Sequence, residues 1–150
     1  MRPITVLVAD RRPAVRAPSL HRLRHDPGLR VVGEARTGGE IVAVTAALKP
    51  RVLLLGDSVR SADLHVMLGL VRRKSGRTRV IVVGHASAPH TLVDAAAHGA
   101  HGWLEATDSP ALVSRAVRAV DSGEAWLPRH LASDILARLQ ALAPRDPVGR

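Results

Sequence analysis

The sequence predicts an α/β domain in which helices cover both faces of a parallel sheet and one further helix follows. Apolar runs and amphipathic stretches alternate five times along the chain, the pattern of successive βα units. The runs at 51–56 and 79–83 show no alternation of polar and apolar residues, which is typical of strands buried on both faces. The run at 51–56 breaks at Gly56 and Asp57, where the chain leaves the carboxyl end of the predicted central strand. In sheets of this kind, sites form at that edge.

Composition narrows the possible classes of protein. The 150 residues, 46% of them apolar, suffice for one domain with its own core. There is no Cys, so disulfides and Cys-based zinc sites are excluded. No apolar run approaches the roughly 18 residues of a membrane span, and the N-terminus has no signal-peptide pattern. We therefore expect a cytoplasmic protein.

The chain is basic, with 22 Lys and Arg against 13 Asp and Glu, a net charge of +9. Such a charge suits nucleic acid or an acidic partner. However, the basic residues are scattered, and no aromatic side chains accompany them as in single-strand binders. Direct nucleic-acid binding by this segment is therefore not expected.

The expected elements follow from apolar spacing and from turn residues. Strands are predicted at 4–9, 29–35, 51–56, 79–83 and 102–105. Helices are predicted at about 13–25, after Gly39 through Leu48, at 63–74, at 89–98 and from Pro110 to about residue 121. Pro18 lies inside the first of these, so that helix either kinks or has its regular part start near Pro18.

The inner faces of three helices can be assigned from spacing. The helix at 63–74 is expected to bury Val66, Met67, Leu70 and Val71. The helix after Pro110 is expected to bury Val113, Ala116, Val117 and Val120, which leaves Leu112 outside this stripe. A last helix after Pro128 carries Leu131, Ile135, Leu136 and Leu139.

Four segments, in order and at fitting distances, resemble a bacterial response-regulator receiver domain of the NarL/FixJ type. They are 6–10 (VLVAD), 31–35 (VVGEA), 99–104 (GAHGWL) and 123–127 (GEAWL), which resemble the first, second and fifth strands and the segment joining a receiver to its output domain. The resemblance implies a flavodoxin-like (CheY-like) doubly wound five-stranded parallel sheet, order 2-1-3-4-5, with an extra C-terminal helix. We accordingly divide the chain into a receiver-like domain (1–125), a C-terminal helix (126–142) and a linker (143–150) toward an output domain absent from it.

The resemblance also implies a chemistry, the transfer of a phosphoryl group to an Asp. Such receivers use two acids after strand one to hold Mg²⁺, an acceptor Asp ending strand three, a Ser or Thr ending strand four and a Lys after strand five. Here Asp10 keeps the first acid, while the other four positions hold, in that order, Arg11, Gly56, Gly84 and Ala106. The sequence thus resembles a degenerate receiver with no metal and no cofactor, in which Arg11 puts a cation where Mg²⁺ would sit.

Asp57 offers an alternative acceptor, one residue beyond the expected position. A one-residue slip of a buried strand would reverse all its side chains, so we favour a loop carboxylate paired with Arg11. Gly56 and Gly84 remove side chains from the floor of this vestigial pocket, whose rim includes His85. Either a cavity for a small ligand or a collapse of the loops onto each other is expected there.

Two further residues are candidates by resemblance. Trp103 occupies the position of the aromatic switch, or else is only a large residue on a half-buried edge strand. Leu112 is a candidate dimer contact. The histidines at 85, 90, 98 and 101 fit no metal-binding spacing, have no evident partner and are expected to be solvated.

The leading functional hypothesis is a phosphorylation-independent receiver of an atypical response regulator. It would control transcription through homodimerisation, a partner or a small ligand, and would reach DNA only through the absent output domain. The alternatives are a small-molecule sensor that uses the cleft of Asp10, Arg11 and Asp57, and a conventional receiver phosphorylated on Asp57. The sequence has no nucleophile–base pair and no Gly-rich phosphate loop, so an enzyme is not expected.

Overall fold

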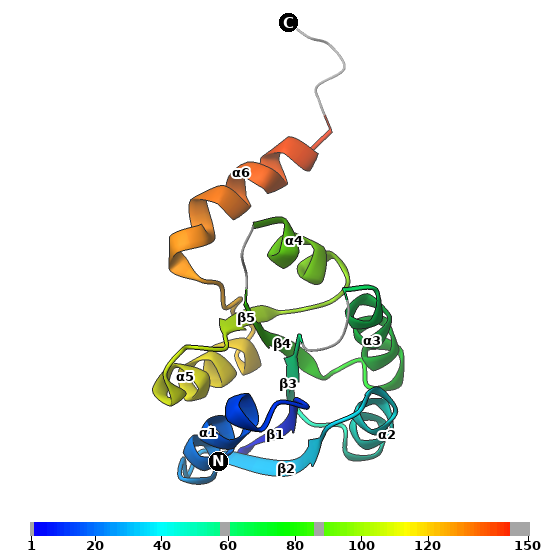
Figure 1. Cartoon of the computed structure of the whole chain (residues 1–150), viewed down its shortest axis with the longest axis vertical. Coiled ribbons are helices and arrows are strands. Elements are labelled where there is room, and N and C mark those ends of the chain that lie inside the picture. The colour runs from blue at the N-terminus through cyan, green and yellow to red at the C-terminus, as the bar shows by residue number, and fades with distance from the viewer. Residues whose placement is uncertain (1, 58–60, 86–88, 145–150) are drawn as a thin grey trace, which may run out of the picture.

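Five parallel strands form one sheet in the order β2-β1-β3-β4-β5, as the resemblance implied (Figure 1). The structure is a computed structural model that describes residues 2–57, 61–85 and 89–144. The strands are β1 (Ile4–Ala9), β2 (Leu29–Ala35), β3 (Val52–Gly56), β4 (Arg79–Gly84) and β5 (Gly102–Glu105). All five residues of β3 are buried, which confirms the central strand predicted from its unbroken apolar run.

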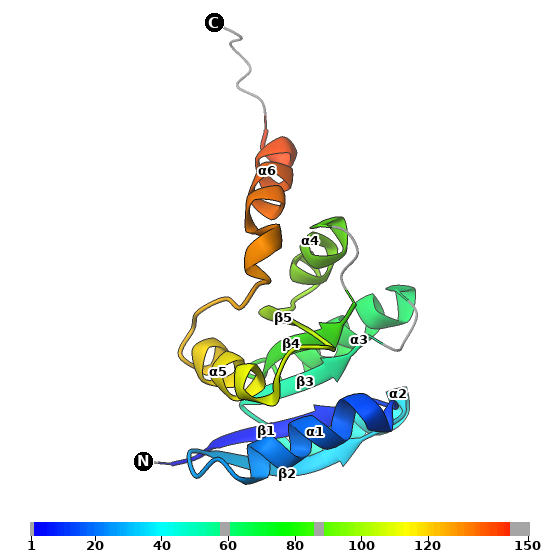
Figure 2. The ribbon, with the colours of Figure 1, turned by 60° about the vertical axis from the view of Figure 1, so that its left-hand side comes forward.

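Helices cover both faces of this sheet (Figure 2). They are α1 (Pro13–Arg24), α2 (Gly38–Leu48), α3 (Ser61–Lys74), α4 (Pro89–Ala97) and α5 (Pro110–Asp121). One core lies between the sheet and α1 and α5, and the other lies between the sheet and α2, α3 and α4. Aliphatic side chains fill both cores, and each one that is fully buried contributes about 1.5–3 kcal/mol to folding. No helix in the described part of the chain is long and apolar enough to cross a membrane.

The inner faces of the helices agree with the sequence prediction in α5 but not in α3. In α5, the four expected residues are buried. In α3, the buried stripe is instead Leu64, Met67, Leu68 and Val71, the i, i+3, i+4, i+7 spacing of one helix face. Val66 lies 61% exposed, so its assignment to the core was wrong. The helix is rotated because Leu64 and Leu68 together bury more apolar surface than Val66 does.

Helix α1 runs without interruption through Pro18. The second alternative for this helix, a regular part that begins only near Pro18, is therefore wrong. Arg12 is the N-cap residue, and Pro13 occupies the first turn, where its missing N–H costs nothing. Packing of Leu20 and Leu23 against the sheet offsets the backbone hydrogen bond that Pro18 cannot donate.

The C-terminal part begins as an extended segment and becomes helical later than residue 126. Trp126 forms a parallel bridge with Gly102, and its carbonyl accepts a 2.8 Å hydrogen bond from Trp103 N–H. A short 3-10 helix, η1 (Arg129–Leu131), then leads into α6 (Ala132–Leu142). Of the predicted linker, residues 143 and 144 are described and 145–150 lie outside the described residues.

Helix α6 projects beyond the sheet and packs against α4 (Figure 1). Ile135 is its one buried residue. Leu136 and Leu139, expected on the same apolar face, are 57% and 50% exposed. They are exposed because α6 projects beyond the sheet, and the described residues cover only part of its surface.

His101 connects the starts of β4 and β5. Its backbone N–H donates to the Val80 carbonyl (2.7 Å), and its Nδ1 accepts from Val80 N–H (3.0 Å). The expectation that this residue has no partner was wrong. Desolvation lowers the pKa of His101, and the positive charges of Arg79 and Arg72 lower it further. The neutral ring, which can accept from Val80, is therefore the folded form.

This pairing predicts a stability that depends on pH. Because the folded pKa of His101 lies below its unfolded value of about 6.5, the unfolded chain binds the proton more readily. The stabilisation is present above about pH 6.5 and is lost as the pH falls toward the lowered pKa. In His101→Asn, an amide oxygen can replace Nδ1 as acceptor but cannot titrate. We expect the melting temperature to fall more between pH 7.5 and 5.5 in wild type than in the variant; equal falls would contradict this assignment.

Candidate functional site

The site predicted from the sequence lies at the carboxyl edge of the sheet, where β1, β3 and β4 end. Leu55 pairs with Ala9 and Gly56 with Val83 in the sheet register. The register therefore brings Asp10, Gly56, Asp57 and Gly84 to one edge. These four residues lie together as the sequence predicted.

Asp10 is the buried acid of the site, with 4% of its surface exposed. The guanidinium of Arg12 donates to both of its oxygens, Nε to Oδ1 at 3.0 Å and Nη2 to Oδ2 at 2.9 Å. Asp10 Oδ1 also accepts from the Arg12 backbone N–H at 2.9 Å. This bidentate, charge-assisted contact compensates the buried carboxylate for its loss of hydration.

Asp57 approaches the same guanidinium from the end of β3. Arg12 Nη2 lies 3.1 Å from Asp57 Oδ1, and the His85 backbone N–H donates to Asp57 Oδ2 at 3.2 Å. The Asp57 backbone N–H donates to the Val83 carbonyl at 2.9 Å. Asp57 is thus held on the β4 side of the site, with 22% of its side chain still exposed.

Two glycines make room for these two acids. A Cβ at Gly56 would overlap the Asp10 carboxylate, and a Cβ at Gly84 would overlap the Asp57 carboxylate. The acids therefore fill the space that side chains at 56 and 84 would occupy. Beside Gly56, on the α1 face, the described residues enclose a cavity of only about 10 Å³, less than one water needs. The two expectations for this pocket were a cavity for a small ligand and a collapse of the loops onto each other. Because the two acids fill the space, the structure is closer to the second.

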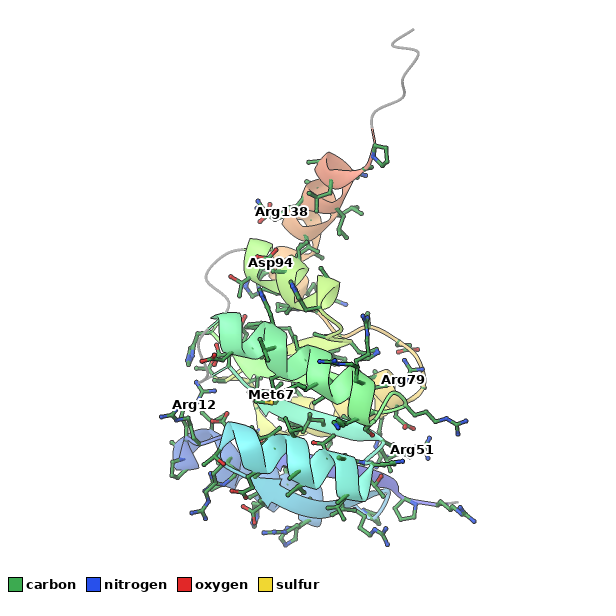
Figure 3. The ribbon with its side chains drawn as sticks, turned by 90° about the vertical axis from the view of Figure 1, so that its right-hand side faces the viewer. Arg12, Arg51, Met67, Arg79, Asp94 and Arg138 are labelled. Atoms are coloured by element: carbon green, nitrogen blue, oxygen red, sulfur yellow. The ribbon has the colours of Figure 1, made fainter. Side chains whose placement is uncertain are left out.

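The cation of the site is Arg12, so the assignment of this role to Arg11 was wrong. Arg11 is exposed, and neither an ion pair nor a side-chain hydrogen bond links it to the described residues. The Asp10 carboxylate binds the N–H two residues on, which turns the chain so that residue 12 faces the sheet edge. Figure 3 shows Arg12 at this end of the sheet. An acid followed by an Arg at the helix N-cap is a signal that could have found it.

A second arginine, also missed from the sequence, supports the turn. Arg16 is buried in α1, and its Nη1 donates to the Asp10 carbonyl at 2.6 Å. Its Nε lies 3.3 Å from Glu34 Oε1 on β2. Arg16 thus fixes the backbone of Asp10 while Arg12 binds its side chain.

The Nη2 group of Arg12 is surrounded by oxygen. Asp10 Oδ2, Asp57 Oδ1 and the Val83 carbonyl oxygen lie 2.9, 3.1 and 3.3 Å from it. The hydrogen bond to Asp10 raises the pKa of Arg12 above its ordinary value, against the effect of burial, and Asp57 adds to the rise. The guanidinium is therefore a permanent cation. Within the described residues, no group of three or more acidic, His or Cys side chains could hold a metal.

Among the described residues, the side chains of the remaining candidates make no hydrogen bond or ion pair with Asp10, Arg12 or Asp57. Ala106 follows β5, and its methyl side chain provides no ammonium group at this position. Its backbone N–H donates to the Gly84 carbonyl at 2.9 Å. His85 is exposed at the rim and contributes its backbone N–H. His98 Nδ1 lies 2.7 Å from the Asp94 carbonyl, and its ring stacks on that of His65 at 3.8 Å; the side chain of His90 lies outside the described part.

Trp103 is buried in the core, whereas Leu112 is only half-buried. Trp103 is 2% exposed in the core beneath α4 and α6. Three of the four residues of β5 are buried, so the expectation of a half-buried edge strand was wrong. The Trp103 ring is covered because α6 adds Ile135 to that core. A rotation of the ring would require α4 or α6 to move. Leu112 is half-buried outside the inner stripe of α5, as predicted.

Comparisons with known proteins show that the chain is similar to response regulators in sequence and in structure. No protein-family model matches it. It is 27% identical over 139 residues to the nitrate/nitrite response regulator protein NarL of Escherichia coli K12, covering 93% of this chain and 64% of NarL. It is 29% identical over 149 residues to the DNA-binding transcriptional activator DevR/DosR of Mycobacterium tuberculosis, covering 97% and 67% of the two chains. The chain thus spans about two thirds of the length of these relatives.

A solved structure gives the same result. The signal receiver domain of the response regulator NarL from Mycobacterium tuberculosis superposes with a TM-score of 0.76 at 26% sequence identity. The superposition covers 83% of this chain and all of that domain. The similarity is one of fold, a five-stranded parallel sheet in the order β2-β1-β3-β4-β5.

The geometry predicts unequal roles for the two neighbouring arginines. Arg12→Gln would leave the buried Asp10 carboxylate without its charged partner, and we expect a loss of about 2–4 kcal/mol in the free energy of unfolding. Arg11→Gln, with the same loss of charge, should change it by less than about 0.5 kcal/mol because that side chain is exposed. Denaturant unfolding of both variants measures the difference. Equal losses would contradict the assignment of the site cation to Arg12.

Proposed function

We propose that this chain, which is a receiver domain related to those of NarL/LuxR-family response regulators, signals without phosphorylation of an aspartate. The observation that carries the proposal is the position of Arg12 Nη2, among three oxygens of the kind that would otherwise bind Mg²⁺. A guanidinium built into the chain pairs with both acids but offers no open coordination position to a phosphoryl donor.

The other groups that phosphoryl transfer to an aspartate needs are also missing. The positions of the acceptor, the hydroxyl and the ammonium group hold Gly56, Gly84 and Ala106. Cation, hydroxyl and ammonium act together to neutralise the transferred group. With Asp10 alone kept, the remaining residues bind one another instead of a substrate, which supports a regulatory rather than a catalytic role for the site.

The Arg12 contacts hold the site in one arrangement. They join the turn after β1 to the turn after β3 and to the end of β4. In a receiver that responds to phosphate, these turns are free to rearrange when charge is added. Here one guanidinium already pairs with both acids, so we propose that the domain rests in a constitutive state that assembly or a bound ligand changes.

The relatives suggest how that state is read. NarL is a response regulator and DevR/DosR a DNA-binding transcriptional activator by their names. We propose that this chain likewise contributes to the control of transcription, and that an output domain beyond the described residues contacts DNA. The net charge of +9 would favour proximity to DNA.

Two alternatives remain distinct from this proposal. Phosphorylation of Asp57 would require its carboxylate to leave Arg12 and the His85 N–H. A small-molecule sensor at the same cleft would require a ligand to displace the carboxylates that lie against Gly56 and Gly84. Both carry the cost of breaking charge-assisted contacts, so the phosphorylation-independent receiver is favoured.

The chemistry can be tested directly. Incubation with acetyl phosphate and Mg²⁺ should leave the intact mass of the protein unchanged, because the acceptor position is Gly56 and Asp57 is engaged by Arg12. Intact-mass spectrometry measures the result, and a receiver of known phosphorylation serves as the positive control. A phosphoryl adduct that disappears in Asp57→Asn would contradict the proposal and establish the conventional alternative.

We further propose that the chain forms a homodimer through the outer side of α5. Leu112 lines a groove of about 520 Å³ beside Leu127, which is 42% exposed. Arg115 lies over the Trp126 ring at 6.0 Å in the same groove. Acidic and basic side chains both line it, namely Glu105, Asp108, Arg115 and Arg129. A surface with both signs of charge around apolar residues can pair with its own copy across a two-fold axis.

This dimer should form without a phosphate trigger. Light scattering of the wild type is expected to give a dimer mass at micromolar concentration, and Leu112→Asp should weaken association at least roughly tenfold by placing a charge in the contact. Val66→Asp, which adds the same charge at an exposed position on α3, is the matched control and should remain dimeric. A wild type that stays monomeric at high concentration would show that self-association does not reside in this segment.

A further inference from the structure

A second charged site lies at the opposite edge of the sheet, where β3 and β4 begin. Arg51, Arg77, Arg79 and His101 line a cavity of about 590 Å³ there, together with Gly76, Thr78 and Asp121. Figure 3 shows Arg51 and Arg79 near each other at this end and Arg12 at the other. The cavity is therefore separate from the site described above and shares no residue with it.

The backbone holds Arg51 and Arg79 side by side. The Arg79 N–H donates to the Arg51 carbonyl at 3.0 Å. The turn that carries Arg77 is fixed by the buried Thr78 hydroxyl, which donates to the Pro50 carbonyl and contacts the Ser75 hydroxyl, both at 2.6 Å. The three guanidinium groups thus extend from backbone positions that cannot separate easily.

The charges at this edge are not balanced. Asp121 is the one acid that lines the cavity among the described residues, and its carboxylate is bound to Arg51 at 2.8 Å. Within the same part of the chain, Arg77 and Arg79 have no acidic partner within ion-pair distance. Arg72 lines an adjoining cavity of about 270 Å³ that also reaches His101. Like charges held together repel unless an anion lies between them.

His101 adds a neutral donor to these cations. Its Nδ1 is occupied by Val80 N–H, so in the neutral ring the proton lies on Nε2. Burial lowers the pKa of His101 most, and the positive charges of Arg79 and Arg72 lower it further. A bound anion would offset these charges and raise the pKa of His101.

We propose that this cavity binds a small anion with two or more phosphate groups. Arginine forks match phosphate oxygens two at a time, and Arg77 and Arg79 offer two forks without an acidic partner among the described residues. A volume of about 590 Å³ is in the range of small-molecule sites and exceeds the need of a single phosphate. None of the described residues that line the cavity is Phe, Tyr or Trp, so contacts to phosphate rather than stacking on a base would dominate recognition.

The proposal goes beyond the function proposed for the Arg12 site and does not depend on it. Isothermal titration of the full chain with tripolyphosphate, orthophosphate and ATP at constant ionic strength tests it. We expect tripolyphosphate to bind more tightly than orthophosphate. If ATP binds as tightly as tripolyphosphate, the natural ligand is a nucleotide. If ATP binds more weakly, the natural ligand is an inorganic polyphosphate. Either result supports a phosphate site.

Variants locate the binding. Arg77→Gln with Arg79→Gln should weaken tripolyphosphate binding by about 100-fold, roughly tenfold for each guanidinium that no longer donates to the phosphates. Arg36→Gln with Arg138→Gln removes the same charge from exposed positions outside the cavity and should change the affinity less than about threefold. In wild type, saturation should raise the pKa of His101 measured by NMR.

Three outcomes would overturn the proposal. The first is no detectable binding of tripolyphosphate. The second is an equal loss of affinity in both double variants, which would show attraction by net charge alone. The third is a single-stranded DNA oligonucleotide that binds through Arg77 and Arg79 while tripolyphosphate does not, which would make this edge a nucleic-acid surface.

Discussion

The carboxyl edge of the sheet depends on the contact between the Arg12 guanidinium and the buried carboxylate of Asp10. A carboxylate that is 4% exposed is costly unless a charged partner and hydrogen bonds compensate it. Arg12 supplies both and also reaches Asp57 and the Val83 carbonyl. The glycines at 56 and 84 follow from this arrangement, because any side chain there would collide with one of the two acids.

A cation that belongs to the chain differs from a bound metal ion in one physical respect. A metal can leave, exchange its ligands or accept a phosphate oxygen, whereas the guanidinium is permanent and its Nε and Nη2 groups are already paired. The edge at which a receiver would sense phosphate therefore holds a cation from the start. Regulation would then reside elsewhere, in the outer side of α5 or in the arginine-lined cavity at the amino edge of β3 and β4.

The sequence was sufficient for the fold and for most of the site, but not for its details. Unbroken apolar runs identified the strands, and the resemblance supplied their order, which the structure confirms. The structure places Gly56 against Asp10 and Gly84 against Asp57 at the predicted edge. Arg12 was missed because the side chain that faces the edge is set by how Asp10 turns the chain, not by counting from it. Val66 and Leu136 were misplaced because spacing gives several possible phases for an apolar helix, and packing selects one.

The central claim is that Arg12 occupies the place of the divalent cation, and a Mg²⁺ titration followed by thermal melting tests it most directly. Since a ligand that binds only the folded state raises its melting temperature, wild type should be insensitive to millimolar Mg²⁺. Arg12→Gln, which leaves the two carboxylates without a cation, should regain part of its lost stability as Mg²⁺ is added. If Mg²⁺ stabilises the wild type as much as the variant, the guanidinium does not fill the metal site.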